Sequence, residues 1–548
     1  MKRFIRKRKL IKNKLISTQK RKTAEATKLR TFIEYGRLFR YTLLVVTIVL
    51  TFALLSLSIN WSGLFVVNYL DNSFFPLGQL TRYISMLTGL GIIGALFLYS
   101  INHYLKIFKT VSFKNNIEML LGVFTLLLAL LMTRIMMYIL QTPVDASHLT
   151  IRIVSALKYT PLFPSIMSAI LCGILLPIPG ALIIVSVFSL CIGIMYHGDF
   201  VIFIMSILSL SIGILISFRA RRRSHLMRAG LVTGIIQGLF IFAGGIISEQ
   251  EAPLLIIHSL NGITNGFLGG FFCAGLLPIM EALFHVTTDI RLVELSDLNH
   301  PLLKKLVLEA PGTYHHSLIV ANLAESAAEV VGANPLLTRV GSYFHDIGKL
   351  KKPEYFSENE WRGKSRHDKL IPSMSSLIII SHVKDGIDLS RKYGLPKEIV
   401  EIIQQHHGRS LVFFFFKRAE QNLQMNETIN EEEYRYPGPI PQTKEAAIIL
   451  LADATEAASR SLDKPTPSRI SNLIENIFNS RIADGQLNNS QLTMNDLTRI
   501  KECFAYILNS IFHTRPKYPD DETKIIEDTH ENQDKQSPET VSDIPIND

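Results

Sequence analysis

Phe344-His345-Asp346-Ile347-Gly348-Lys349 is the stretch on which the interpretation of this chain depends, because a histidine and an aspartate stand side by side after a helically periodic segment. Other histidines and aspartates lie before and after it: His315, His316, His382, His406, His407 and Asp453. Neutral imidazoles and carboxylates are ligands that iron, manganese and zinc accept. This many groups on successive helices can hold two metal ions, and a two-metal site is suited to hydrolysing phosphate esters.

The same stretch contains residues that suit a phosphate substrate. Neighbouring residues on a helix diverge by ~100°, so His345 can grip one ion while Asp346 bridges two ions through its carboxylate oxygens. Lys349 follows Asp346 by three residues, on the same helical face, where it can meet a non-bridging phosphate oxygen. A solvated lysine at a helix end fits the sequence equally well. Gly348 either lets the substrate come close or ends the helix.

Residues 290–515, which surround this stretch, are typical of one helical domain. They are charged, with apolar residues at three- and four-residue spacing. Gly332 closes one helix and Asn334-Pro335 opens the next, whereas strand signals are few and no glycine-rich phosphate loop follows a strand. Residues 519–548 are acidic and polar with few large apolar side chains, which predicts a disordered tail.

The part of the chain before residue 290 has the apolar composition of an integral membrane protein. Eight apolar segments can be drawn there, at approximately 41–59, 83–101, 118–140, 161–179, 181–197, 199–217, 229–247 and 261–284. Most reach the ~20 residues that a spanning helix needs, so we expect a polytopic bundle of about eight spans. In the last segment Gly262, Gly266 and Gly270 recur every four residues, which predicts a small-residue face for close helix packing.

The net charge of +10 is concentrated in one tail, since residues 1–40 carry fifteen Lys and Arg against two Glu. We expect this tail to fix topology and contact anionic lipid, and not to bind nucleic acid, because no aromatic residues are interleaved with its charges. With an even number of crossings, the basic clusters at 102–117 and 219–228 lie on the N-terminal side and the acidic loop Ser248–Glu251 lies opposite. Both termini and the helical domain are then cytoplasmic, at the cell membrane. Four unclustered cysteines suit a reduced, cytoplasm-facing protein: Cys172, Cys191, Cys273 and Cys503.

The order His, His-Asp, further histidines and then Asp resembles the HD phosphohydrolase superfamily. The resemblance is closest to the membrane-bound 7TM-HD family, the PgpH-type cyclic-di-AMP phosphodiesterases. It covers residues 290–515 densely and the spans in pattern only. The strings that carry it include Thr313–Ser317, Ala321–Glu325, Asn334–Leu337, His345–Lys349, His367–Leu370, Ser381–Gly386, Gln405–Gly408, Tyr436–Pro439 and Lys464–Pro467.

The resemblance implies a centre of two divalent metal ions, iron or manganese. Its ligands would be His316, His345, Asp346, His382, His406, His407 and Asp453. The first metal would take His316, His345 and Asp453, and the second would take the other three histidines, with Asp346 as the bridge. The implied reaction is hydrolysis of cyclic-di-AMP to pApA in second-messenger signalling.

Further roles and boundaries follow from the residues and the resemblance taken together. Asp346 and Lys349 would be catalytic, Gly348 and His367 would contact the substrate, and His315 would be a neighbour of the ligands. The chain would divide into a basic cytoplasmic tail at 1–40, a transmembrane region at 41–285, an HD phosphohydrolase domain at 286–516 and a disordered acidic tail at 517–548. Family members typically carry a large extracellular domain after the first span, whereas only about residues 60–82 fill that gap here.

Three alternatives stay open at the level of sequence. The first is an HD hydrolase of another nucleotide, cyclic-di-GMP or (p)ppGpp, although no Gly-Tyr-Pro motif follows the His-Asp pair. The second is a catalytically silent membrane receptor that binds nucleotide, which the intact ligand set disfavours. The third is a transporter, which the scarcity of paired charges in the spans disfavours. The expected partners are a cyclic dinucleotide and the lipid bilayer, and a homodimer is left open.

Overall fold

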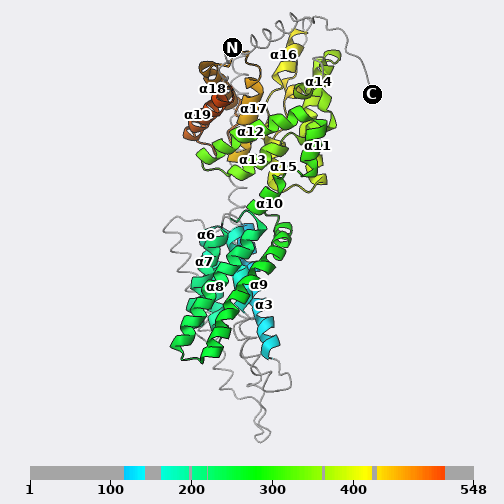
Figure 1. Ribbon diagram of the computed structural model, residues 1–548. Helices are drawn as coiled ribbons and strands as arrows, with labels where there is room; N and C mark the ends of the chain where they lie inside the picture. The colour runs from blue at the N-terminus through cyan, green and yellow to red at the C-terminus, as the bar shows by residue number, and fades with distance from the viewer. Residues whose placement is uncertain are drawn as a thin grey trace, which may run out of the picture. The chain divides into compact units, whose positions relative to one another are not determined.

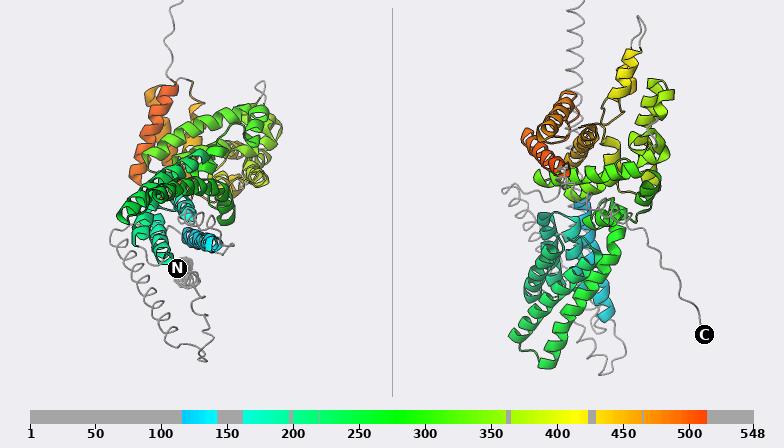
Figure 2. Two further views of the ribbon diagram at one scale, coloured as in Figure 1. Left: turned by 60° about the horizontal axis from the view of Figure 1, so that its bottom comes forward. Right: turned by 45° about the horizontal axis from the view of Figure 1, so that its top comes forward.

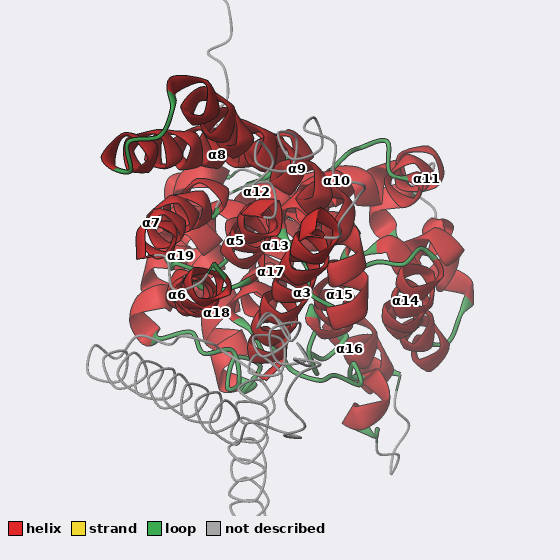
Figure 3. Ribbon diagram, turned by 90° about the horizontal axis from the view of Figure 1, so that it is seen from below, coloured by secondary structure: helices red, strands yellow, loops and turns green. Residues whose placement is uncertain are grey.

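The computed structural model describes residues 116–141, 162–196, 200–218, 220–360, 365–422, 429–463 and 465–512. In these ranges every regular element is a helix, apart from an isolated bridge between Leu411 and Arg435, so the all-α prediction is confirmed for the described part (Figure 3). The predicted spans 41–59 and 83–101 and both predicted tails lie outside it. The chain divides into two compact units: one runs to Leu308 and includes Ile387–Glu401, and the other comprises Glu309–Gly386 and the residues from Ile402 onward.

The first unit is built around apolar helices (Figure 1). They are α3 (Asn116–Gln141), α5 (Phe163–Leu175), α6 (Ile178–Met195), α7 (Phe200–Ser217), α8 (Arg223–Ile247) and α9 (Ala252–Phe284). Among the described residues, all of these but α5 are long and apolar enough to cross a membrane, which makes five candidate spans. α9 begins at Ala252, before the predicted start at 261, because a proline in its first turn opens the helix ahead of the most apolar stretch.

α8 and α9 run side by side along a seam of glycines (Figures 1 and 2). A Cβ added to Gly234 of α8 would lie 2.5 Å from the carbonyl oxygen of Gly262, and one added to Gly270 would lie 2.9 Å from that of Leu226. Both distances are too short for a real Cβ, so glycine alone lets these two backbones approach this closely. The small-residue face predicted for α9 therefore meets a matching glycine series on α8, which was not predicted.

Short helices follow α9. α10 (Asp289–Leu295) begins after Thr288, whose side chain accepts a hydrogen bond from the backbone nitrogen of Arg291 at 3.3 Å. Glu294 near its end pairs with Arg223, the first residue of α8, at 2.7 Å. α10 is thereby fixed to the start of α8, and α11 (Pro301–Glu309) comes next.

The second unit is packed around α17 (Lys444–Ser459). Residues 446–452 of this helix are all buried, so this part of α17 has no solvent-exposed face and lies in the core. α12 (Pro311–Val330) contributes small buried residues, including Ala324 and Ala327, that let it approach closely. The core is completed by α13 (Pro335–Phe344), α18 (Pro467–Ala483) and α19 (Met494–Ile511).

The remaining elements carry much of the site. They are η3 (Ile347–Lys351), η4 (Pro353–Tyr355), η5 (Ser357–Asn359), η6 (Arg366–Lys369), α14 (Pro372–Lys392), α15 (Lys397–Gln405), α16 (Phe413–Gln421) and η7 (Glu431–Tyr434). The predicted helix boundary between α12 and α13 is confirmed. Gly332 has φ of 66° there, and Asn334 caps α13 by accepting a hydrogen bond from the nitrogen of Leu337 at 3.0 Å.

Candidate metal centre

The His-Asp pair lies at a helix end and not within a continuous helix. α13 ends at Phe344, His345 keeps helical backbone angles, and the chain tightens into the 3-10 helix η3 from Ile347. The expectation of an α-helix running through Lys349 is therefore wrong. The spacing argument survives, because a 3-10 turn also brings residues three apart together: the Lys349 ammonium lies 2.8 Å from Asp346 Oδ2.

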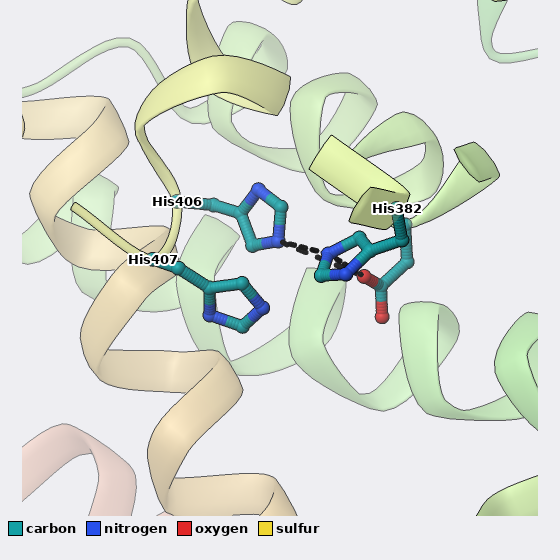
Figure 4. Close-up of side chains that lie close together, drawn as sticks. His382, His406 and His407 are labelled. Carbon is teal, nitrogen blue, oxygen red and sulfur yellow. Dashed lines mark hydrogen bonds and ion pairs between the residues drawn. The ribbon is translucent and has the colours of Figure 1, made fainter. Parts of the chain in front are cut away.

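The other predicted ligands arrive from four elements of the second unit. His316 comes from α12, His382 from α14 and Asp453 from α17, while His406 and His407 directly follow α15. Figure 4 shows His406 and His407 projecting from one segment toward His382 on another. The structure thus gathers all the predicted ligands in one place.

The gathered side chains form two groups. His316, His345 and Asp453 make one group, and Asp346 with the histidines at 382, 406 and 407 makes the other. Within each group, one ligand atom from every residue lies within 4.8 Å of the others. This is the division that the resemblance implied.

Asp346 faces both groups, one oxygen toward each. Its Oδ2 lies 3.2 Å from His345 Nε2 and 3.5 Å from His316 Nε2. Its Oδ1 lies 3.4 Å from His382 Nε2 and 3.6 Å from His406 Nε2. A carboxylate in this position can hold two ions at once.

The histidine rings are fixed so that their Nε2 atoms face the centre. The Nδ1 atoms of His345, His382 and His406 lie 2.7, 2.6 and 2.8 Å from the carbonyl oxygens three residues earlier. A nitrogen that donates to a carbonyl leaves the other ring nitrogen with a free lone pair. The backbone therefore turns three metal-binding nitrogens toward Asp346, one from the first group and two from the second.

Buried atoms without hydrogen bonds mark the same point. In the described part of the chain, His316 Nε2, His345 Nε2 and Asp346 Oδ1 are buried and make no hydrogen bond. His316 Nε2 lies 3.0 Å from Asp453 Oδ1 but lacks hydrogen-bond geometry. Buried polar atoms rarely stay unsatisfied, so these residues fit a metal centre.

His316 is supported differently from the other rings. Its Nδ1 lies 2.5 Å from Glu456 Oε2, and Glu456 is almost fully buried. The Glu456 carboxylate is held in turn by Arg460, whose Nε lies 2.6 Å from Oε1. Carboxylate–histidine–metal arrangements of this kind orient a ligand and raise its basicity. Glu456 was not predicted, and its only signal is its place one turn after Asp453.

The protonation states also suit ligands. Burial lowers the pKa of His382 to about 4 and holds the pKa of His407 well below its ordinary value, so both rings are neutral at pH 7. Burial raises the pKa of Asp346, but His345 and Lys349 outweigh it and the pKa lies well below the ordinary value. Metal ligands must be neutral imidazoles and ionised carboxylates, which these three groups are. His316 differs: burial lowers its pKa, but Asp453 and Glu456 outweigh burial and raise the pKa to about 10, so this ring must give up a proton when it binds a metal.

Lys349 is partly buried, with 13% of its side chain exposed, and it is paired. Besides Asp346, its ammonium contacts Glu358 Oε1 at 2.6 Å, and the Thr313 hydroxyl donates to the same oxygen at 3.1 Å. Burial lowers the pKa of Lys349, but the Asp346 and Glu358 carboxylates raise it above its ordinary value. The alternative of a solvated lysine is therefore wrong, and Glu358 is a further residue that was not predicted.

The predicted substrate contacts lie at the edge of the centre. Gly348 is buried, and a Cβ there would meet the backbone of α14 at His382 and Gly386, so the packing of η3 on α14 explains the glycine. His367 packs against Phe415, with ring centroids 4.8 Å apart. Their contacts with substrate stay predictions. His315 is exposed, whereas His316 is buried.

Two family profiles match the chain. Residues 84–288 match a profile described as a 7TM receptor with intracellular HD hydrolase, and residues 313–458 match the HD domain. Both ligand groups lie inside the second match.

Two characterised relatives are similar over longer stretches. The chain is 38% identical over 446 residues to the cyclic-di-AMP phosphodiesterase PgpH of Bacillus subtilis (strain 168), which covers 80% of this chain and 61% of that protein. It is 42% identical over 304 residues to the PgpH of Listeria monocytogenes serotype 1/2a (strain 10403S), and the match covers 55% of this chain and 42% of that protein. The chain thus spans less than two thirds of the length of these relatives. A crystal structure of the L. monocytogenes PgpH HD domain in complex with cyclic-di-AMP is 45% identical, with a TM-score of 0.38, over 40% of this chain and all of that one.

Proposed function

The chain belongs to the family of 7TM receptors with an intracellular HD hydrolase, and we propose that it is a di-metal phosphodiesterase. As a member of this family, it is a multi-pass membrane protein with an HD domain inside the cell. Its substrate would be cyclic-di-AMP, cleaved to pApA at the cytoplasmic face. The observation that carries the proposal is the position of Asp346, with one carboxylate oxygen toward each of two His/Asp groups.

Each side chain has a role in this proposal. His316, His345 and Asp453 would hold one ion, and the histidines at 382, 406 and 407 would hold the other, with Asp346 shared. Two divalent ions, iron or manganese, would supply an activated water and offset the charge of the phosphoryl group. Lys349 keeps the shared carboxylate in place from the side of η3, because its ammonium is bound to Asp346 and Glu358 at once.

The substrate assignment rests on the named relatives. Both are cyclic-di-AMP phosphodiesterases, at 38% and 42% identity. Cyclic-di-GMP and (p)ppGpp remain alternative substrates for the same centre, since the described site shows no contact that distinguishes adenine from guanine. The intact ligand set favours an enzyme over a catalytically silent receptor.

The proposed topology has eight crossings, with both termini in the cytoplasm. It assigns residues 1–40 to a basic tail, 41–285 to the membrane, 286–516 to the HD domain and 517–548 to an acidic tail. The five candidate spans in the described residues and the Lys/Arg distribution support it. Reporter fusions after residues 20 and 520 should report the same side of the membrane; opposite sides would mean an odd number of crossings.

The activity is tested with the purified full chain in lipid nanodiscs. Stripped of metal with a chelator and reloaded with Mn²⁺ or Fe²⁺, it should convert cyclic-di-AMP to pApA with a higher kcat/KM than cyclic-di-GMP. Full turnover after complete metal removal would refute the metal mechanism. A preference for cyclic-di-GMP would overturn the substrate and leave the centre standing.

A further inference from the structure

A cavity of about 570 Å³ lies along α18 in the second unit. It is lined by one face of this helix, by Leu411 and Phe413, by two arginines, Arg435 and Arg481, and by Asp484, which pairs with Arg435. Apolar surface beside fixed cations is the lining expected of a site for an organic anion.

The cavity is tied to the metal centre through the loop that follows His407. In that loop, the backbone nitrogen of Arg409 donates to Gln486 Oε1 at 2.8 Å. The nitrogen of Gln486 donates to the carbonyl oxygen of Arg481 at 3.0 Å, which joins the loop to the end of α18. These bonds place Arg481 on the element that supports the metal-binding loop.

A second link runs through Tyr436. Its ring stacks on His407, with centroids 4.3 Å apart, and its backbone nitrogen donates to the Ser410 carbonyl oxygen at 3.1 Å. The neighbouring residue, Arg435, lines the cavity. The segment that stacks on His407 through Tyr436 therefore also contributes Arg435 to the lining of the cavity.

The two arginines of the cavity differ in their partners. Arg435 is fully engaged: its guanidinium pairs with Asp484 at 3.1 Å and with Glu431, and it donates to the Arg409 carbonyl oxygen at 2.8 Å. No described residue lies within ion-pair or hydrogen-bond distance of the Arg481 guanidinium. Burial lowers the pKa of Arg481, and the nearby Asp453, Asp484 and Tyr436 act against this shift without pairing with the guanidinium. Arg481 is thus an uncommitted cation beside the centre.

A cyclic dinucleotide needs such a cation. It carries two phosphodiester anions, and a di-metal centre engages the one that is cleaved. Lys349, the cation that contacts Asp346, is already bound to two carboxylates. We propose that Arg481 binds the second, uncleaved phosphodiester of the cyclic dinucleotide, with the rest of the ring entering the α18 cavity. A guanidinium suits this task because its fork of donors matches two phosphate oxygens. This inference rests on the proposed function.

Two substrates separate the role of Arg481 from that of the centre. The full chain in nanodiscs, loaded with Mn²⁺, is assayed with cyclic-di-AMP and with bis(p-nitrophenyl) phosphate, which has a single phosphodiester. Arg481→Ala should raise KM for cyclic-di-AMP by roughly 10- to 100-fold, the loss expected for a charge-assisted hydrogen-bonded pair. Its kcat/KM for bis(p-nitrophenyl) phosphate should stay within about twofold of the parent, because that substrate has no second phosphate.

Two further variants keep the test decisive. Arg469→Ala removes an exposed arginine from the first turn of the same helix, away from the cavity, and should leave both substrates unaffected. Arg481→Lys keeps the charge without the fork and should recover part of the affinity, which also covers the case in which the alanine variant does not fold. An unchanged KM for cyclic-di-AMP in Arg481→Ala, or equal losses with both substrates, would overturn the inference. A parent chain that cleaves bis(p-nitrophenyl) phosphate but not cyclic-di-AMP would instead overturn the substrate assignment.

Discussion

The histidines of the two ligand groups are held in two different ways. His345 in one group, and His382 and His406 in the other, each have Nδ1 near a carbonyl oxygen three residues back, at 2.7, 2.6 and 2.8 Å. His316 Nδ1 instead contacts the Glu456 carboxylate, which lies 140 residues away in the sequence. The first kind of support forms with the local backbone that carries the histidine. The second forms only when α12 and α17 pack correctly, so the group of His316 depends on tertiary structure through this ring.

The largest loss of activity should come from removing Asp346, the carboxylate that the two ligand groups share. Asp346→Ala takes one oxygen from each group, so we expect hydrolysis of cyclic-di-AMP to fall by at least about 1000-fold, several kcal/mol of transition-state stabilisation. Bound metal should fall from two ions per chain to one or none, measured by elemental analysis. Asp388→Ala, an exposed aspartate on α14, serves as control. Two retained ions with a normal rate would show that Asp346 is not the bridge.

Removing a ligand from one group at a time should reduce activity strongly, but less than Asp346→Ala does. His316→Ala and His382→Ala should each lower bound metal to about one ion per chain and reduce kcat by roughly 100-fold, because the remaining ion keeps part of the electrostatic stabilisation. His315→Ala is the matched control, since this neighbour is exposed. A greater loss in His315→Ala than in His316→Ala would mean that the other histidine of the pair is the ligand.

Removing the charge of Glu456, which supports His316, should weaken metal binding in the group of His316 and leave the other group unchanged. Glu456→Gln keeps the shape but not the charge behind His316, and should lower the affinity for one ion by roughly 10- to 100-fold while the other ion binds normally. Competition with a chelator measures the two affinities separately. Glu329→Gln, exposed on α12, should change neither. Equal weakening of both ions would contradict the difference between the halves.

The smallest effect should follow from changing the support of the shared carboxylate. Glu358→Gln removes one of the two carboxylates that hold Lys349, and should reduce kcat by roughly 3- to 10-fold with two ions still bound. The neighbouring Glu360→Gln is the control. Loss of a metal ion in Glu358→Gln would place Glu358 in the ligand set instead of behind Lys349.

The ligands could be predicted from the sequence because of their order and spacing. His345, Asp346 and Asp453 follow a recognisable pattern, and the structure gathers them. Glu456 could not be found in this way, because a glutamate in an alanine-rich helix is usually solvated and its role depends on a distant partner. Its contribution exists only in the packed domain.

The local backbone was harder to predict than the site. The sequence predicts that the helix continues through Lys349, yet the chain forms a 3-10 helix from Ile347, and its Gly348 packs against the backbone of α14. The sequence leaves open whether Gly348 ends the helix or allows a close approach, and only the tertiary contact shows why this position needs a glycine. The glycines of α8 teach the same lesson, since Gly234 is explained only by the backbone of α9 across from it.

The shared carboxylate is tested most directly by magnetic resonance on the Mn²⁺-loaded full chain. Two Mn²⁺ ions per chain, bridged by Asp346, should be magnetically coupled, and the coupling should disappear in Asp346→Ala together with the hydrolysis of cyclic-di-AMP. Two uncoupled ions in an active parent chain, or full activity with a single ion, would contradict a centre built from two His/Asp groups around one carboxylate.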